Sequence, residues 1–132
     1  MKTLYNFMRP KKKQSVRFTV SDRFLDEEGN LAVWEMRPLS GQKAVEVQEQ
    51  TEGQSEVRRM AACAAEAMIV PDLHDKELLD WISEQEGRPV LSAADALLYL
   101  LNDLELAEVI RLYSKLIGDG VSVAALAEEA KN

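Results

Sequence analysis

The chain has 132 residues, 46% of them hydrophobic and 30% charged, and a formal net charge of −7. This size and balance predict one domain with its own core, and they exclude collagen-like, mucin-like and low-complexity classes. No apolar run approaches the ~18 residues that span a bilayer, and no leader-like stretch of ~7–15 apolar residues precedes the lysines at 11–13. We therefore expect a cytoplasmic protein with no membrane partner.

Charge is distributed unevenly along the chain. Residues 1–23 hold seven basic residues and one acidic residue, a net charge of +6, which leaves −13 for residues 24–132. An acidic body repels phosphate backbones, which argues against nucleic acid as a partner of the whole domain. The basic segment is compatible with contacts to nucleic acid, a membrane or an acidic protein, and also with plain solvation or rest against the acidic body.

A single cysteine and a single histidine exclude an intramolecular disulfide and a four-ligand zinc site. Cys63 lies in the small apolar stretch 60–65, where a free thiol is expected to pack as a small hydrophobe. The acidic turn at 26–30 lacks the alternating acidic pattern and the closing glutamate of a calcium loop. The sequence therefore implies no metal and no cofactor.

Residues 1–14 are expected to form a basic N-terminal arm with a short helix, which ends at a proline. Apolar and polar residues then alternate over 16–24 and again over 32–37, the pattern of half-buried strands. The turn-forming residues 26–30 join them into a β-hairpin, and a second proline ends it. We place Phe18, Val20 and Trp34 on the apolar face of this hairpin, and Arg23 and Arg37 on the opposite, polar face.

Everything after Ser40 is predicted to be helical. Helix-starting residues, glycines and Pro71 divide this region into helices at about 40–51, 55–70, 75–87, 92–101 and 104–117. Residues 119–132 are expected to form a short C-terminal helix or a frayed tail. The predicted fold class is α+β, with an N-terminal β-hairpin followed by about five helices in a single compact, mainly helical domain over residues 15–118.

Motifs of enzymes are missing from the sequence, which has no glycine-rich phosphate loop, no paired-cysteine motif and no hydrolase or metalloprotease signature. His74 lies between two aspartates and is the best candidate for a general base. In a polar connection between helices, such a histidine is more often an exposed side chain or a helix-end contact. We expect a protein that is not an enzyme, with no catalytic residues.

Three apolar residues lie outside the predicted core stripes and are candidates for binding a partner: Trp81, Tyr99 and Leu112. Tyr99 belongs to a segment that is apolar all round, so one side can face the core while another faces a partner. Leu112 shares its predicted helix face with Glu105, Glu108 and Lys115. Single exposed apolar residues are also common on ordinary surfaces, and a fully buried helix is apolar all round.

The hairpin strings 20–30 and 33–39, the Val70-Pro71-Asp72-Leu73 turn and the final amphipathic helix together resemble the XkdN-like tail assembly chaperones of Gram-positive phages and prophages. The resemblance spans roughly residues 4–118. It departs from the family pattern after Glu84 and at Asn102-Asp103, where a Pro-Gly junction is expected.

This resemblance implies a role without an active site. Such a protein would bind the tape measure protein, keep it soluble, help recruit tail tube subunits and be absent from the finished tail, and a homo-oligomer is compatible with that role. One alternative is a non-catalytic adaptor or regulatory module of another class, which would bind DNA through the basic arm in a salt-dependent way. Another is a small enzyme that depends on His74.

Overall fold

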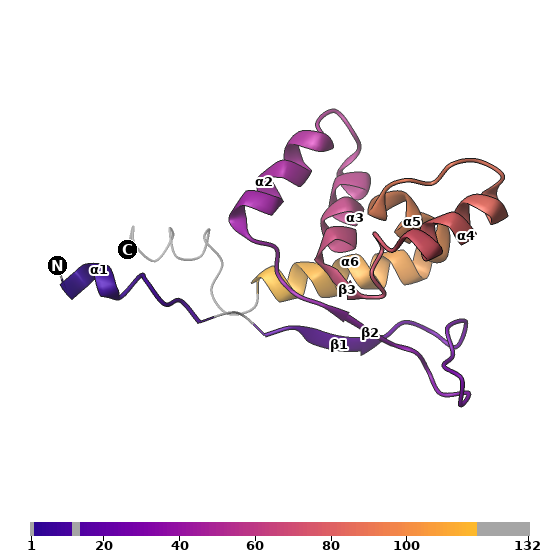
Figure 1. The fold of residues 1–132 in the computed structure, drawn as a ribbon, viewed down its shortest axis with the longest axis horizontal. Helices are drawn as coiled ribbons and strands as arrows, with labels where there is room; N and C mark the ends of the chain where they lie inside the picture. The colour runs from indigo at the N-terminus through magenta and orange to yellow at the C-terminus, as the bar shows by residue number, and fades with distance from the viewer. Residues whose placement is uncertain (1, 12–13, 119–132) are drawn as a thin grey trace.

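The computed structural model describes residues 2–11 and 14–118. Within these ranges it contains six helices and a three-stranded sheet (Figure 1). The helices are α1 (Lys2–Tyr5), α2 (Gly41–Gln50), α3 (Glu56–Ala67), α4 (Lys76–Glu86), α5 (Ala93–Leu100) and α6 (Asp103–Gly118), and the strands are β1 (Val16–Thr19), β2 (Val33–Met36) and β3 (Met68–Val70).

The predicted hairpin is confirmed, and its alternation sets which side chains reach the core. β1 and β2 are antiparallel, with Phe18 opposite Trp34. Trp34 and Met36 are buried, whereas Val33, the first residue of β2, is exposed to solvent. The turn closes because the Asp26 carboxylate accepts hydrogen bonds from the backbone N–H groups of two residues that follow it, and Gly29 supplies the positive φ.

A third strand corrects the prediction that everything after Ser40 is helical. β3 pairs antiparallel with β2, with Met36 opposite Met68 and an irregular register at that point. The helix expected over 55–70 ends at Ala67 because the residues before Pro71 are driven toward extended conformations, and because β2 offers them hydrogen-bonding partners. The sheet order is β1-β2-β3.

α3 is the central helix of the body. It packs against α2, α5 and α6, and its alanines and its single cysteine are almost completely buried. Small side chains allow helix axes to approach closely, which explains how three neighbours fit around one helix. Figure 1 shows the hairpin along one side of this body, with α2 toward one end and α4 and α5 toward the other.

Helix starts follow the predicted capping residues. The side chains of Ser40, Ser55, Asp75 and Ser92 each accept a hydrogen bond from the backbone N–H three residues later.

The α+β class is confirmed, but the described helices number six rather than about five, since α1 precedes the hairpin. The predicted C-terminal helix or tail at 119–132 lies outside the described residues. Across residues 2–11 and 14–118, no helix has the length and apolar character needed to cross a bilayer.

Candidate partner-binding surface

Trp81 of α4 and Tyr99 of α5 form an aromatic pair. Their ring centroids are 6.4 Å apart and their planes are tilted by 77°, an edge-to-face arrangement. The Trp81 side chain is 49% exposed, whereas Tyr99 is half-buried against the core. Edge-to-face contact stabilises such a pair by ~0.5–1.5 kcal/mol beyond area burial, so the ring of Trp81 is held in place although half of it faces solvent.

The backbone that carries Trp81 is fixed on both sides. Ile82, the next residue of α4, is fully buried. The Ser83 hydroxyl oxygen accepts a 2.8 Å hydrogen bond from the backbone N–H of Val90, which ties the α4–α5 connection back onto α4. Gly87 ends α4 in the left-handed conformation. The aromatic pair therefore lies on a rigid support, as an anchor for a partner requires.

Leu112 does not join this surface, and its predicted exposure was wrong. It is partly buried and packs against the core. The buried stripe of α6 consists of Glu105, Val109, Tyr113 and Leu116, so the helix is rotated from the predicted orientation. The sequence prediction treats Glu105 as a solvent-facing charge, and it therefore places Leu112 on the solvent-exposed face of the helix.

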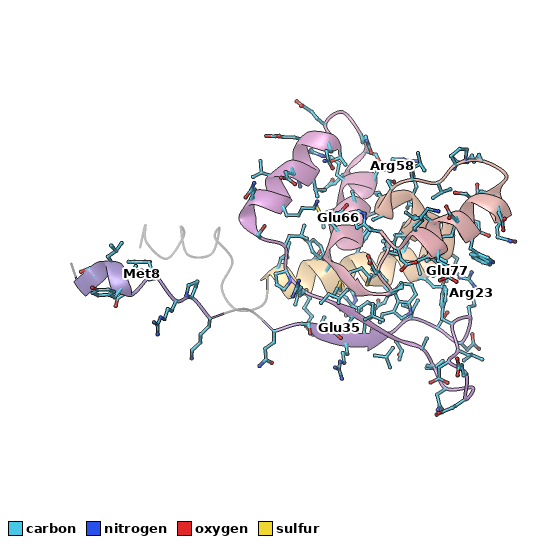
Figure 2. All side chains as sticks on the ribbon, viewed as in Figure 1. Met8, Arg23, Glu35, Arg58, Glu66 and Glu77 are labelled. Atoms are coloured by element: carbon cyan, nitrogen blue, oxygen red, sulfur yellow. The ribbon has the colours of Figure 1, made fainter. Side chains whose placement is uncertain are left out.

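Glu105 is buried because its carboxylate has several hydrogen-bond donors. Asn102 and Glu105 form a reciprocal capping box: the Asn102 side chain accepts from the N–H of Glu105 at 2.8 Å, and the Glu105 carboxylate accepts from the N–H of Asn102 at 2.9 Å. The Ser21 hydroxyl and the Arg23 guanidinium also donate to this carboxylate. Arg23 further donates to the carbonyl of Leu100 at 3.3 Å. Figure 2 shows Arg23 where the hairpin meets the helices.

These contacts shift the ionisation of Glu105. Burial alone would raise the pKa of its carboxyl, but the hydrogen bonds from Asn102 and Ser21 and the charge of Arg23 outweigh burial and hold the pKa below its usual range. The prediction that Arg23 lies on the polar face of the hairpin did not include its contacts with the helices. Its guanidinium joins the hairpin to the start of α6 and to the end of α5, next to the segment that carries Tyr99.

His74 is hydrogen-bonded to Glu66, which also forms an ion pair with Lys43. Its Nε2 atom is 2.8 Å from a carboxylate oxygen of Glu66 on α3, and the Lys43 Nζ atom is 3.7 Å from the same oxygen. Lys43 and Glu66 also line an open hollow of about 800 Å³ beside β3. Ser40, a hydroxyl in this hollow, already accepts the helix-capping hydrogen bond from Lys43. The cluster links α2, α3 and the loop before α4.

Cys63 is buried, as the sequence predicts. Its thiol accepts a hydrogen bond from the Gln48 side chain at 3.8 Å and contacts the Tyr113 hydroxyl. Burial raises the pKa of this thiol, which makes it a poor nucleophile. In the described part of the chain, no three His, Cys, Asp or Glu side chains gather as metal ligands.

Comparisons with known proteins bear on the fold. No family model matches the chain, and no curated protein matches it. Among solved structures, the crystal structure of the protein YqbN, a structural genomics target, matches 83% of this chain and 91% of that chain, with a TM-score of 0.67 and 20% sequence identity. In fold, the chain is similar to YqbN. Because most of YqbN is covered, this arrangement of sheet and helices is not particular to one sequence.

Sequence reasoning missed the two most exposed large apolar side chains of the described residues. Leu91, in the α4–α5 connection, is 80% exposed, and Leu104, in the first turn of α6, is 78% exposed. Leu104 could have been found by the argument that selected Leu112. It too lies away from the apolar face that the sequence predicts for this helix, which consists of Leu106, Val109, Ile110, Tyr113, Leu116 and Ile117. Leu91 carries no such signal, since it follows buried Val90 in an irregular segment.

Proposed function

We propose that the chain is a phage or prophage tail assembly chaperone. In this role it binds the tape measure protein, keeps it soluble and helps recruit tail tube subunits, and it is absent from the finished tail. It acts by binding alone and has no catalytic residues, and its place of action is the cytoplasm of the bacterial host. Support comes from the resemblance of the hairpin strings and the Pro-Asp-Leu turn to XkdN-like proteins.

The observation that carries the binding mechanism is the half-exposed Trp81 ring braced by Tyr99. A helical client presents apolar side chains at intervals of three and four residues, and it docks by inserting them beside rigid apolar anchors. Tryptophan and tyrosine are enriched among residues that dominate binding energy, because they bury a large area with few rotatable bonds. The acidic surface of the body, with −13 over residues 24–132, keeps a complex with such a client in solution.

Co-expression with the tape measure protein tests this proposal. We expect the wild-type chain to keep the tape measure protein in the soluble fraction. Trp81→Ser should lose this effect although it still unfolds cooperatively, with a melting temperature lowered only by the loss of the Trp81–Tyr99 contact. Tyr99→Ser should weaken the effect, because Trp81 loses its support. Leu91→Ser is the matched control, since it removes an apolar side chain that is even more exposed but lies outside the pair. Full solubilisation by Trp81→Ser would place the client surface elsewhere. Failure of the wild-type chain to keep the tape measure protein soluble would contradict the role itself.

A further inference from the structure

The N-terminal arm carries large apolar side chains that are mostly exposed to solvent. α1 continues as successive turns to Met8, through hydrogen bonds from the N–H groups of Asn6, Phe7 and Met8 to carbonyls three residues earlier. The four large apolar side chains of this segment are 59–73% exposed: Leu4, Tyr5, Phe7 and Met8. In Figure 2, Met8 lies on an arm that points away from the other helices and the sheet.

Exposure on this scale is unusual for a monomer. Single exposed apolar residues are common, but a contiguous patch of several hundred Å² is about the largest that monomers present, and such patches mark interaction sites. Two aromatic and two aliphatic side chains within five positions offer such a patch. Basic residues follow it directly, with Arg9 and Lys11 both exposed. The arm therefore fits a surface that is apolar at its centre and acidic at its edge.

A surface of that kind lies on α2 of the same chain. Ala44 and Val45 form the apolar part of an open hollow of about 440 Å³, and Val45 is 56% exposed. Glu49 and Glu52 line the same hollow. Among residues 2–11 and 14–118, neither carboxylate has an ion-pair partner.

The one cation of the hollow is already engaged. Arg59 donates to the Thr51 hydroxyl at 3.3 Å and to the carbonyl of Gln48 at 3.1 Å, both on its own chain. Its guanidinium is thereby turned toward the end of α2. The two glutamates consequently leave the rim of the hollow acidic, which complements Arg9 and Lys11 of an arm.

We propose that the N-terminal arm of one copy docks on the α2 hollow of a second copy, with Tyr5 and Phe7 over Val45 and the basic residues of the arm beside Glu49 and Glu52. One chain supplies both complementary surfaces, while its own arm extends away from its own helices. This self-association does not depend on the proposed chaperone function. The Trp81–Tyr99 pair is part of neither contact surface.

Sedimentation velocity and light scattering of the full chain, from about 2 to 200 μM, test the proposal. The wild-type chain should associate as concentration rises, and high salt should weaken association because rim charges contribute to it. The arm variant Tyr5→Ser/Phe7→Ser and the hollow variant Glu49→Lys/Glu52→Lys should each associate at least tenfold more weakly. Leu91→Ser, the exposed apolar control, should associate as the wild type does. All substituted side chains are exposed, so melting temperatures should stay unchanged.

Mixing the two variants provides the sharpest readout. The arm variant retains an intact hollow and the hollow variant retains an intact arm, so the mixture should form a heteromeric pair that neither forms alone. A wild-type chain that is monomeric over the whole range would overturn the proposal, including the case in which the arm folds onto its own α2. Association that survives loss of Tyr5 and Phe7 would also overturn it. So would a monomer whose arm binds vesicles of anionic phospholipid.

Discussion

Arg23 in the hairpin loop donates to the carboxylate of Glu105 in the first turn of α6, across 82 positions of sequence. The same carboxylate caps its own helix through the N–H of Asn102. One side chain thus fixes where α6 begins, how it is rotated and where the hairpin rests on it. A carboxylate this enclosed would be costly to bury without those donors.

Removing the cation should expose that cost. We expect Arg23→Ala to lower the free energy of unfolding by about 1–3 kcal/mol, because the buried Glu105 carboxylate loses a charge-assisted hydrogen bond from the half-exposed guanidinium. Urea unfolding measures the change. Arg111→Ala is the control, since it breaks an exposed ion pair with Glu108 on the same helix and should cost less than about 0.5 kcal/mol. Equal effects of the two substitutions would mean that the partly buried Arg23–Glu105 pair stabilises no more than a surface pair.

Acid should act on the same carboxylate. A free glutamate has a pKa of about 4.3, and the folded-state pKa of Glu105 lies below that value. The charged carboxylate therefore contributes its full stabilisation of the fold above the free value. This stabilisation is lost as pH falls through the lowered folded-state value. Glu105→Gln removes this titration, and its unfolding free energy should therefore fall less steeply than the wild type between about pH 5 and 3. Parallel curves for the two proteins would contradict the assignment.

Trp34 anchors the hairpin in the core. It is 3% exposed, and its ring centroid lies 6.3 Å from that of Phe18 and 5.2 Å from that of Phe24. The contact with Phe24 is edge-to-face. Trp34→Ala should lower the free energy of unfolding by about 3–5 kcal/mol. Val33→Ala, the preceding and exposed strand residue, should change it by under about 1 kcal/mol. A denaturation midpoint unaffected by Trp34→Ala would be inconsistent with this packing.

α3 packs against its neighbours through small, buried side chains. Ala64 is fully buried where the helix meets its neighbours. Ala64→Leu should destabilise the protein by about 1–3 kcal/mol or more through overpacking. The same substitution at exposed Ala107 of α6 should be within about 0.5 kcal/mol of neutral, since leucine is a good helix former. Melting temperatures of the two variants provide the comparison, and a neutral Ala64→Leu would reveal unfilled space beside α3.

Tyr113 gives a second pH prediction, on the alkaline side. Burial, followed by the contact with Cys63, raises the pKa of Tyr113 to about 12. The unfolded chain ionises its tyrosines near pH 10, so stability is complete below that pH and declines as pH rises toward 12. Tyr113→Phe should show a smaller loss of unfolding free energy than the wild type between about pH 9 and 11. Identical losses would indicate that the Tyr113 hydroxyl is ionised as easily in the folded protein.

Sequence patterns predicted the elements whose local signals agree with their surroundings. The alternation around Trp34 and Met36 identified the hairpin, and the capping serines located helix starts. β3 was missed because its three residues continue an alanine-rich helical pattern, and only pairing with β2 makes them a strand. The rotation of α6 was missed because the partners of Glu105 come from a distant part of the chain, which no helical periodicity can reveal.

The candidate surface was predictable only in part. Trp81 and Tyr99 were selected singly, as apolar residues outside core stripes, and their edge-to-face contact depends on how α4 and α5 pack. Leu112 was selected by the same reasoning and failed, because one buried carboxylate reversed the apparent polarity of its helix face. Selection of exposed apolar residues from periodicity thus depends on correct assignment of every charged neighbour.

The alanines of α3 also leave its rotation about its own axis poorly specified by shape. Neighbouring faces of an alanine-rich helix look alike to a packing partner, so several rotated arrangements would fill space almost equally well. Two side chains remove this degeneracy. Glu66 must reach His74 and Lys43, and Cys63 must meet Gln48 and Tyr113. His74, the best candidate for a general base in the sequence, thus takes part in contacts that favour one rotation of α3 over the others.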